Sequence, residues 1–182
     1  MARLSLVIGP VGAGKSTFVT HLRQRRGAVD MNLDAWMATL YGADERPAEG
    51  RVAWYLERRD RCLRQIWDTA VRALNAGTEV VLEVGLIRRD ERARFYQQVD
   101  ATAHPLTVFL LDAPREERRA RVARRNAARG ETFAMEVPME VFELASDLWE
   151  PPEQDERQAR EIVEVMDVAT PDGALTWLYP GV

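Results

Sequence analysis

Short apolar runs alternate with longer segments of mixed polarity along the chain. The apolar runs are typical of strands buried in a parallel sheet, and they cover residues 4–8, 28–33, 78–84, 106–111 and 162–166. The segments between them have helical periodicity, and the helices that they predict cover residues 16–25, 34–40, 48–76, 89–101, 115–129 and 139–149. Strands that alternate with helices predict an α/β fold with a mostly parallel five-stranded sheet. We expect residues 172–182 to form a short tail with one helical turn.

Length and composition indicate one globular domain. A chain of 182 residues can bury a sizeable core, and no repeat or linker divides it, so we expect a single domain over residues 1–182. The sequence is 46% hydrophobic and 30% charged, which is typical of a soluble globular protein. No apolar run approaches the roughly 20 residues of a membrane span, so no membrane partner is expected.

The cysteine count and the net charge indicate the cellular compartment and the kind of partner. Cys62 is the only cysteine, so the chain forms no internal disulfide, as is usual in a reducing cytosol. The first predicted strand begins almost at residue 1, which leaves no room for a signal peptide, and we expect a cytoplasmic protein. The formal net charge of −4 argues against a protein that coats nucleic acid.

A glycine-rich loop joins the first predicted strand to the first predicted helix. Residues 9–16 read G-P-V-G-A-G-K-S, which matches the G-x-x-x-x-G-K-S pattern of a P-loop. Glycines let the backbone aim successive N–H groups at phosphate oxygens, and the helix N-terminus adds a favourable dipole. We expect the Ser16 hydroxyl to ligate Mg²⁺. The residues expected to bind a nucleotide here are Gly12, Ala13, Gly14, Lys15, Ser16 and Thr17.

The only lysine of the chain lies in this loop. Of the 25 basic residues, 24 are arginines, and Lys15 is the exception. A slim ammonium group suits the interior of a phosphate-binding loop better than a planar guanidinium group does. The position of Lys15 therefore supports nucleotide binding, with its side chain at the β- and γ-phosphates.

Three acidic residues lie at the ends of predicted strands, where α/β folds place their ligands. Asp34 is either a general base that accepts a proton from an attacking hydroxyl or the N-cap of the next helix; beside a P-loop we favour the base. Glu83 ends an otherwise apolar strand, where a carboxylate is costly unless it is used, and we expect it to hold Mg²⁺ or to position substrate. Asp112 competes for the role of metal-binding acid, although it more closely resembles a helix cap.

The predicted helix over residues 115–129 is dense in arginine. Seven arginines face only two glutamates there, which gives a local charge of +5. A charged run is usually a solvated face, but a surplus of one sign repels itself unless an anion or acidic neighbours lie close. We therefore expect a lid that closes over a triphosphate and stabilises charge on the transferring phosphoryl group.

Aromatic and basic residues near Asp34 are candidates for the acceptor site. Trp36 lies two residues after Asp34, and Trp54 and Arg58 lie one turn apart on the long predicted helix. These side chains either line a pocket or pack against a neighbouring element. We expect the acceptor to lie between them and Glu83, and an aromatic lining suits a ring-bearing or sugar-like compound.

These residues together resemble the small P-loop kinases of the group that includes zeta toxins, chloramphenicol phosphotransferase and the 5′-hydroxyl polynucleotide kinase domain. Members of this group are often described only as AAA-type ATP-binding proteins. The resemblance covers most of the chain. Its parts are the P-loop, Asp34, the strand ending at Glu83, the sequence R-N-x-x-R-G at residues 125–130, and Val137-Pro138.

The resemblance implies a three-layer P-loop NTPase fold with a five-stranded parallel sheet and a helical lid over about residues 115–137. It also implies that Asp34 is the general base and that Arg125 and Arg129 clamp phosphate, with Arg121 as a lesser candidate for the same site. In the polynucleotide kinases an arginine three residues after the base grips a 3′-phosphate. Met37 occupies that position here, so a nucleic acid is not expected as the partner.

The sequence therefore predicts a Mg²⁺-dependent phosphotransferase that moves the γ-phosphate of ATP, or of GTP, to a hydroxyl of a small molecule. The acceptor is expected to be an antibiotic, a sugar or a nucleoside-like compound. One alternative is a nucleotide-dependent switch or accessory ATPase that acts through a protein partner. Another is a zeta-like toxin kinase that acts on nucleotide sugars. We expect a monomer or a weak homodimer.

Overall fold

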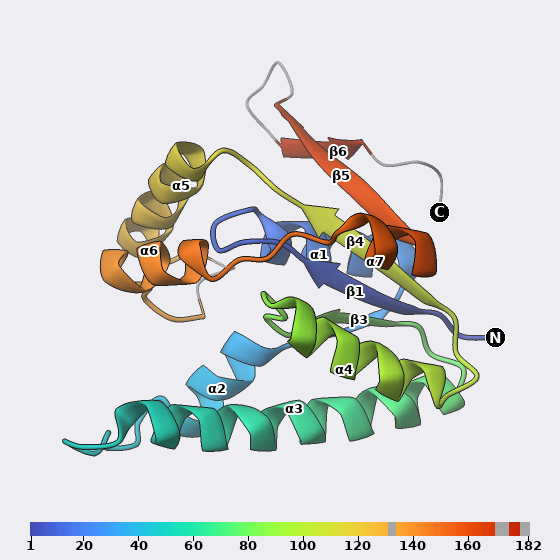
Figure 1. Cartoon of the computed structure of the whole chain (residues 1–182), viewed down its shortest axis with the longest axis horizontal. Helices are drawn as coiled ribbons and strands as arrows, with labels where there is room; N and C mark the ends of the chain where they lie inside the picture. The colour runs from blue at the N-terminus through green and yellow to red at the C-terminus, as the bar shows by residue number, and fades with distance from the viewer. Residues whose placement is uncertain (131–133, 170–174, 179–182) are drawn as a thin grey trace.

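The predicted strands form one central sheet. In the computed structural model, which describes residues 1–130, 134–169 and 175–178, the sheet has the order β2-β3-β1-β4-β5-β6 (Figure 1). The first five strands in this order are parallel to one another, and the last, β6, is antiparallel to β5. The bounds are β1 (Leu4–Ile8), β2 (Val29–Asn32), β3 (Val80–Glu83), β4 (Leu106–Leu111), β5 (Ile162–Ala169) and β6 (Leu175–Leu178). The α/β fold with a mostly parallel sheet is thus confirmed.

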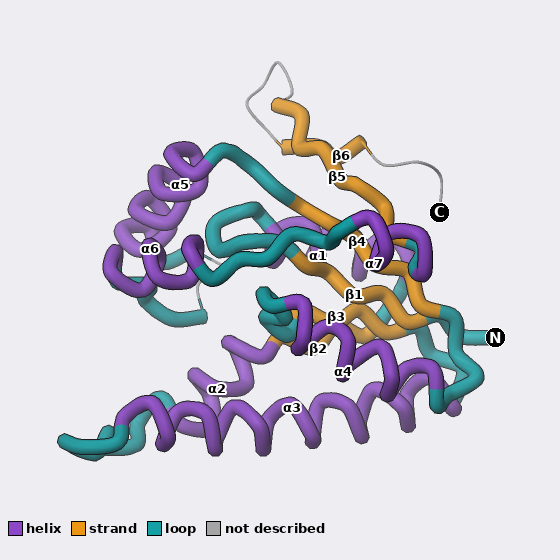
Figure 2. Tube along the Cα trace, in the orientation of Figure 1, coloured by secondary structure: helices purple, strands orange, loops and turns teal. Residues whose placement is uncertain are grey.

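Helices cover both faces of the sheet, in three layers (Figure 2). One face packs against α1, and the other packs against α3 and α4. The helices are α1 (Lys15–Arg26), α2 (Leu33–Tyr41), α3 (Arg51–Asn75), α4 (Arg89–Asp100), α5 (Arg115–Ala128), α6 (Met139–Asp147) and α7 (Gln154–Ala159). None of the helices in the described part of the chain has both the length and the apolar composition needed to cross a membrane.

The alternation of side chains along β1 explains why the core is divided in two. Leu4, Leu6 and Ile8 point to the cluster beneath α3 and α4, while Val7 points to the cluster that contains Phe18 of α1. All of β1 is buried, as expected for a central strand with both faces covered.

Parallel pairing brings the strand ends together at one edge of the sheet. Ile8 of β1 pairs with Leu110 of β4, and Asn32 of β2 pairs with Glu83 of β3. The loops that follow these strands therefore meet at this edge, where α5 and α6 also lie (Figure 1). Ligands of open α/β sheets bind at this edge.

The prediction of a helical turn in the tail is wrong for residues 175–178, and the rest of that prediction lies outside the described residues. This segment forms β6, which pairs with β5 between Ala169↔Leu175 and Met166↔Leu178. The Leu-Thr-Trp-Leu sequence favours a strand, and the open edge of β5 supplies the backbone partners. The ring of Trp177 lies 5.7 Å from that of Phe18 on α1.

Candidate functional site

The P-loop has the backbone that its glycines predict. Gly12 has φ 81° and Gly14 has φ 91°, in the region that favours glycine. Gly14 is also the N-cap of α1, and no side chain caps this helix end. The N–H groups of the first turn therefore remain available to an anion in the loop.

The side chain of Lys15 points back into the P-loop. Its Nζ donates hydrogen bonds to the carbonyl oxygens of Gly9 and Pro10, both at 2.9 Å. Burial lowers the pKa of Lys15, whereas the nearby carboxylates of Glu83 and Asp34 raise it. The ammonium group is thus held by backbone oxygens and acidic neighbours, and phosphate oxygens can replace these partners.

Glu83 is the buried carboxylate of the site. Its side chain accepts hydrogen bonds from Ser16 Oγ at 3.1 Å and from Asn32 Nδ2 at 2.7 Å. Burial raises the pKa of Glu83, and the charge of Lys15 opposes this increase. A carboxylate and a hydroxyl side by side are the hard oxygen donors that Mg²⁺ prefers. Ser16 and Glu83 therefore fit a magnesium site.

The other candidate metal acid, Asp112, lies in a different environment. It is exposed, and its Oδ1 accepts a hydrogen bond from the N–H of Ala113 at 2.7 Å. It does not cap α5, whose N-cap is Pro114 and which has no side-chain cap. The interpretation of Asp112 as a helix cap is therefore wrong, because α5 begins too far along the chain. Of the two acids, Glu83 is the one that contacts Ser16.

Asp34 lies in the first turn of α2, at the mouth of the site. The capping role falls to Asn32, whose Oδ1 accepts a hydrogen bond from Ala35 N at 2.9 Å. The Asp34 side chain is exposed, and its charge acts on Lys15 and on Glu83. The N-cap alternative for Asp34 is therefore excluded. Its carboxylate lies close enough to the P-loop for its charge to act on Lys15. Asn32 was not predicted as a site residue, although its place near the end of the second predicted strand was a signal for it, and the structure pairs it with Glu83.

A buried arginine on α5 supports the P-loop. Arg118 Nη1 donates to Val11 O and to Ser146 Oγ, both at 3.0 Å, and its Nε donates to Ala113 O at 2.9 Å. This guanidinium group joins the P-loop, α5 and α6, and its partners are fixed protein groups. Arg118 was not predicted as a site residue, because in the sequence it is one of seven arginines of the same helix.

The three predicted phosphate-binding arginines lie at different depths. Arg125 Nε is buried without a hydrogen-bond partner among the described residues, and its charge lowers the pKa of Lys15. Arg121 Nη1 lies 3.9 Å from the point where a Cβ on Gly14 would stand. Arg129 is the C-cap that follows α5, with φ 46°, and its side chain is 67% exposed. Arg121 and Arg125 thus lie toward the P-loop, whereas the side chain of Arg129 is exposed at the end of α5.

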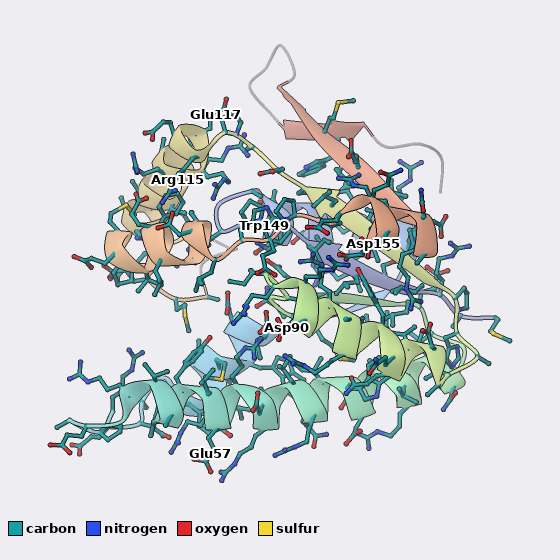
Figure 3. All side chains as sticks on the ribbon, viewed as in Figure 1. Glu57, Asp90, Arg115, Glu117, Trp149 and Asp155 are labelled. Carbon is teal, nitrogen blue, oxygen red and sulfur yellow. The ribbon has the colours of Figure 1, made fainter. Side chains whose placement is uncertain are left out.

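The surplus charge of α5 is partly balanced by α6. Arg115 Nη1 lies 2.7 Å from Asp147 Oδ1, and Arg119 Nε donates to Glu143 Oε1 at 2.8 Å. Figure 3 shows Arg115 between the two helices. Acidic side chains of α6 thus neutralise these two arginines, and the expectation that α5 closes over a triphosphate stays a prediction for the others.

Trp54 and Arg58 form a stack that joins α3 to α2. The Arg58 guanidinium lies 4.0 Å from the centroid of the Trp54 ring and 5.4 Å from that of Tyr41. Arg58 Nε also lies 3.6 Å from Asp44 Oδ2. Trp36 packs against the core cluster beneath α3 and α4. These contacts favour the packing alternative, and a role in acceptor binding stays a prediction.

We expect Gly12→Ala to lower the free energy of unfolding by about 3 kcal/mol, from a disfavoured φ and from overpacking. A Cβ at residue 12 would lie 2.7 Å from Arg118 O. Gly27→Ala is the matched control, because Gly27 has φ 64° but no heavy atom of the described chain lies within 4 Å of its Cβ position. The control should lose only about 1 kcal/mol. Equal losses, measured by urea denaturation, would show that α5 does not constrain the P-loop.

Known structures share this fold. Kti12 from Chaetomium thermophilum, solved with ADP-AlF3, has a TM-score of 0.69 and 18% identity, over 93% of this chain and 92% of that one. A sugar kinase from Janibacter sp. HTCC2649 has a TM-score of 0.60 and 18% identity, over 90% and 84%. A gluconokinase from Sinorhizobium meliloti 1021 has a TM-score of 0.53 and 17% identity, over 93% and 84%.

At this level of identity the similarity shows a common P-loop NTPase fold, and the narrower resemblance to the zeta toxin group stays a prediction. No protein with a curated description matches the chain. The model of one family, described as an AAA domain, matches residues 4–152. Since this match includes the P-loop and most of the sequence, the chain belongs to the AAA domain family.

Proposed function

We propose that the protein is a phosphotransferase that moves the γ-phosphate of ATP, or of GTP, to a hydroxyl of a small molecule. The observation that carries the proposal is the convergence of charges at one edge of the sheet. Two carboxylates, Glu83 and Asp34, lie close enough to raise the pKa of Lys15, and two arginines, Arg125 and Arg118, lie close enough to lower it. A nucleotide-binding loop with an exposed carboxylate beside it suits transfer to an acceptor from solvent.

The P-loop residues would bind the nucleotide phosphates. Backbone N–H groups at the start of α1 would donate to phosphate oxygens, and Lys15 would exchange its carbonyl partners for the β- and γ-phosphates. Arg121 and Arg125 approach the same loop from α5 and would stabilise charge on the transferring group. Arg129 would join them only if the end of the lid moves toward the nucleotide.

Ser16 and Glu83 would hold Mg²⁺, with Asn32 fixing the orientation of the carboxylate. When bound, the ion neutralises charge on the β- and γ-phosphates. Asp34, exposed beside Lys15, would accept the proton of the attacking hydroxyl. The acceptor oxygen would then bond to the γ-phosphorus, while the bond to the nucleoside diphosphate breaks. We further propose that the enzyme acts in the cytoplasm, as a monomer or a weak homodimer, on a small-molecule acceptor.

The test is transfer of label from γ-labelled ATP with Mg²⁺ to a panel of antibiotics, sugars, nucleosides and nucleotide sugars. We expect label in one class of acceptor, and a rate lower by about 10²–10³-fold in Lys15→Ala, because the charge on the phosphates loses its main partner. Arg157→Ala, on α7, is the control for loss of a cationic side chain and should keep the wild-type rate. Label released only as free phosphate would contradict the proposal.

Exposed apolar side chains on α6 support a second candidate, an ATPase that acts through a protein partner. Val141 is 50% exposed, Leu144 is 61% exposed and Leu148, which follows the helix, is 43% exposed. Their spacing places them along one side of the helix, next to the lid. In that case hydrolysis would yield free phosphate and would depend on a partner that binds this stripe.

A further inference from the structure

We propose that the acceptor lies in the groove between α3 and α4, and that it is an uncharged alcohol with an apolar ring system. The inference deepens the proposed function and rests on it, because the hydroxyl of this compound is the one that would receive the phosphate. It names a binding site, the α3–α4 groove, and the chemical class of its ligand.

The size and floor of the groove suit a compound with a ring. Its volume is about 490 Å³, within the range of about 300–1,000 Å³ that is usual for sites of small molecules. Apolar side chains from α3, β3 and α4 form the floor. They include Leu63, Ile66, Trp67, Leu82, Leu86 and Phe95. A floor of this kind gains free energy by covering apolar surface of the ligand, and it offers nothing to a fully hydrated sugar.

Charges at the rim of the groove balance one another. Three arginines and three acidic residues line it, namely Arg59, Arg64, Arg94, Asp60, Asp68 and Glu91. A rim without surplus charge gives no electrostatic complementarity to a dianion or to a polycation. The groove therefore favours an uncharged ligand over a nucleotide sugar or an aminoglycoside.

The Arg59–Glu91 pair supplies the polar contacts. Arg59 Nη2 lies 2.7 Å from Glu91 Oε1, and the two side chains are only 15% and 17% exposed. A shielded pair of this kind offers guanidinium donors and a carboxylate acceptor in a fixed geometry. Hydroxyl or amide groups of a neutral ligand match these partners.

Tyr55 of α3 is a polar neighbour of the groove. It precedes Arg59 by one turn of α3, on the same side of the helix, and it lies within electrostatic range of Asp34, Arg59 and Glu91. Partial burial, together with the charge of Asp34, raises the pKa of Tyr55, so its hydroxyl stays protonated and can donate. Val84, the residue after Glu83, also lines the groove, so the groove reaches the carboxyl end of β3, where the proposed active site lies.

Binding is measured first, with nucleotide absent, by ligand-observed NMR. The neutral probes are chloramphenicol, thymidine and phenyl β-D-glucoside, and the charged probes are uridine diphosphate N-acetylglucosamine, D-gluconate and kanamycin. Leu63→Trp fills the floor of the groove. Gln98→Trp adds a ring at an exposed position that lines the groove, so it narrows the groove without replacing a core residue. Gln97→Trp is the matched control, because Gln97 is exposed but does not line the groove.

We expect a neutral probe to bind at least about tenfold more tightly than any charged probe, and both groove variants to weaken it about tenfold, or about 1.4 kcal/mol. Gln97→Trp should leave the affinity unchanged. The inference is overturned if no neutral probe binds, if a charged probe binds best, or if Gln98→Trp and Leu63→Trp leave binding intact.

Transfer of label from γ-labelled ATP to the same probe separates the inference from the function on which it rests. Label in the probe, lost in the groove variants but not in Gln97→Trp, supports both. Binding in the groove with label released only as free phosphate contradicts the proposed function, and with it the acceptor role of the groove. Label in a compound whose binding ignores the groove variants leaves the function standing and overturns the groove.

Discussion

Asp34→Asn is expected to lower the rate of phosphoryl transfer by about 10²–10⁴-fold, the usual contribution of a positioned general base. The amide keeps the size of the side chain but cannot accept the hydroxyl proton. Asp34 is exposed and does not cap α2, since Asn32 does, so the fold should survive the change. Nucleotide affinity should stay the same or rise slightly, because the carboxylate repels the phosphates rather than binding them.

The measurements are initial rates with an identified acceptor, nucleotide affinity by calorimetry and thermal unfolding. Asp90→Asn is the matched control. Asp90, labelled in Figure 3, has an exposed side chain on α4 and lies outside the proposed site. A wild-type transfer rate in Asp34→Asn would remove Asp34 as the base. If wild type and variant release free phosphate equally fast with every acceptor, the ATPase that acts through a partner becomes the better explanation.

Local patterns in the sequence were sufficient for the parallel strands and for the phosphate-binding loop. β1 and β3 are short, apolar and buried on both faces, so their composition predicts their state. The P-loop is recognised from glycines and a lysine within residues 9–16, and the glycines allow the positive φ values of its backbone. These features require no information about distant parts of the chain.

Contacts between distant residues were not predictable in the same way. Arg118 donates to the carbonyl of Val11, which lies 107 positions away, and nothing local distinguishes it from the other arginines of α5. Likewise, Asp147 and Glu143 of α6 neutralise Arg115 and Arg119, and nothing in the sequence indicated these ion pairs. Some arginines of α5 therefore hold helices together and others lie toward the P-loop, and only the tertiary structure tells them apart.

A network centred on a buried arginine was also missing from the predictions. Arg92 is fully buried on α4 and makes two hydrogen bonds to Glu156 of α7, at 2.7 and 2.9 Å. Tyr96 Oη donates to the same carboxylate at 2.8 Å. Arginine on a predicted helix usually faces solvent. Arg92 is an exception because the fold brings Glu156, 64 positions away in the sequence, into contact with it.

Neighbouring contacts fasten the segment that follows α6 to α4 and to the loop before it. Glu150 N donates to Ile87 O at 3.0 Å, and its Oε2 accepts from Arg89 N at 2.7 Å. In Figure 3, Trp149 and Asp155 mark the course of the segment across the molecule. The segment therefore links the end of α6 to the loop that follows β3.

Arg92→Met is therefore expected to lower the free energy of unfolding by about 3–5 kcal/mol, because it leaves the Glu156 carboxylate buried without its partner. For a chain of this size the melting temperature should fall by about 6–20 °C. Arg94→Met on the same helix is the matched control, because its pair with Asp90 is exposed on both sides. It should cost no more than about 1 kcal/mol.

The double variant Arg92→Met/Glu156→Met distinguishes an unpaired charge from lost packing. Removing both partners takes away the buried carboxylate as well as the guanidinium, so the double variant should be more stable than Arg92→Met alone. Urea denaturation of the four proteins, wild type included, gives the coupling energy of the pair. If the double variant is less stable than Arg92→Met by the full cost of the second change, the two residues are not coupled. The stability of α4 would then depend on the apolar contacts of Phe95 and Val99, and the segment after α6 would still be held by the hydrogen bonds of Glu150 to Ile87 and Arg89.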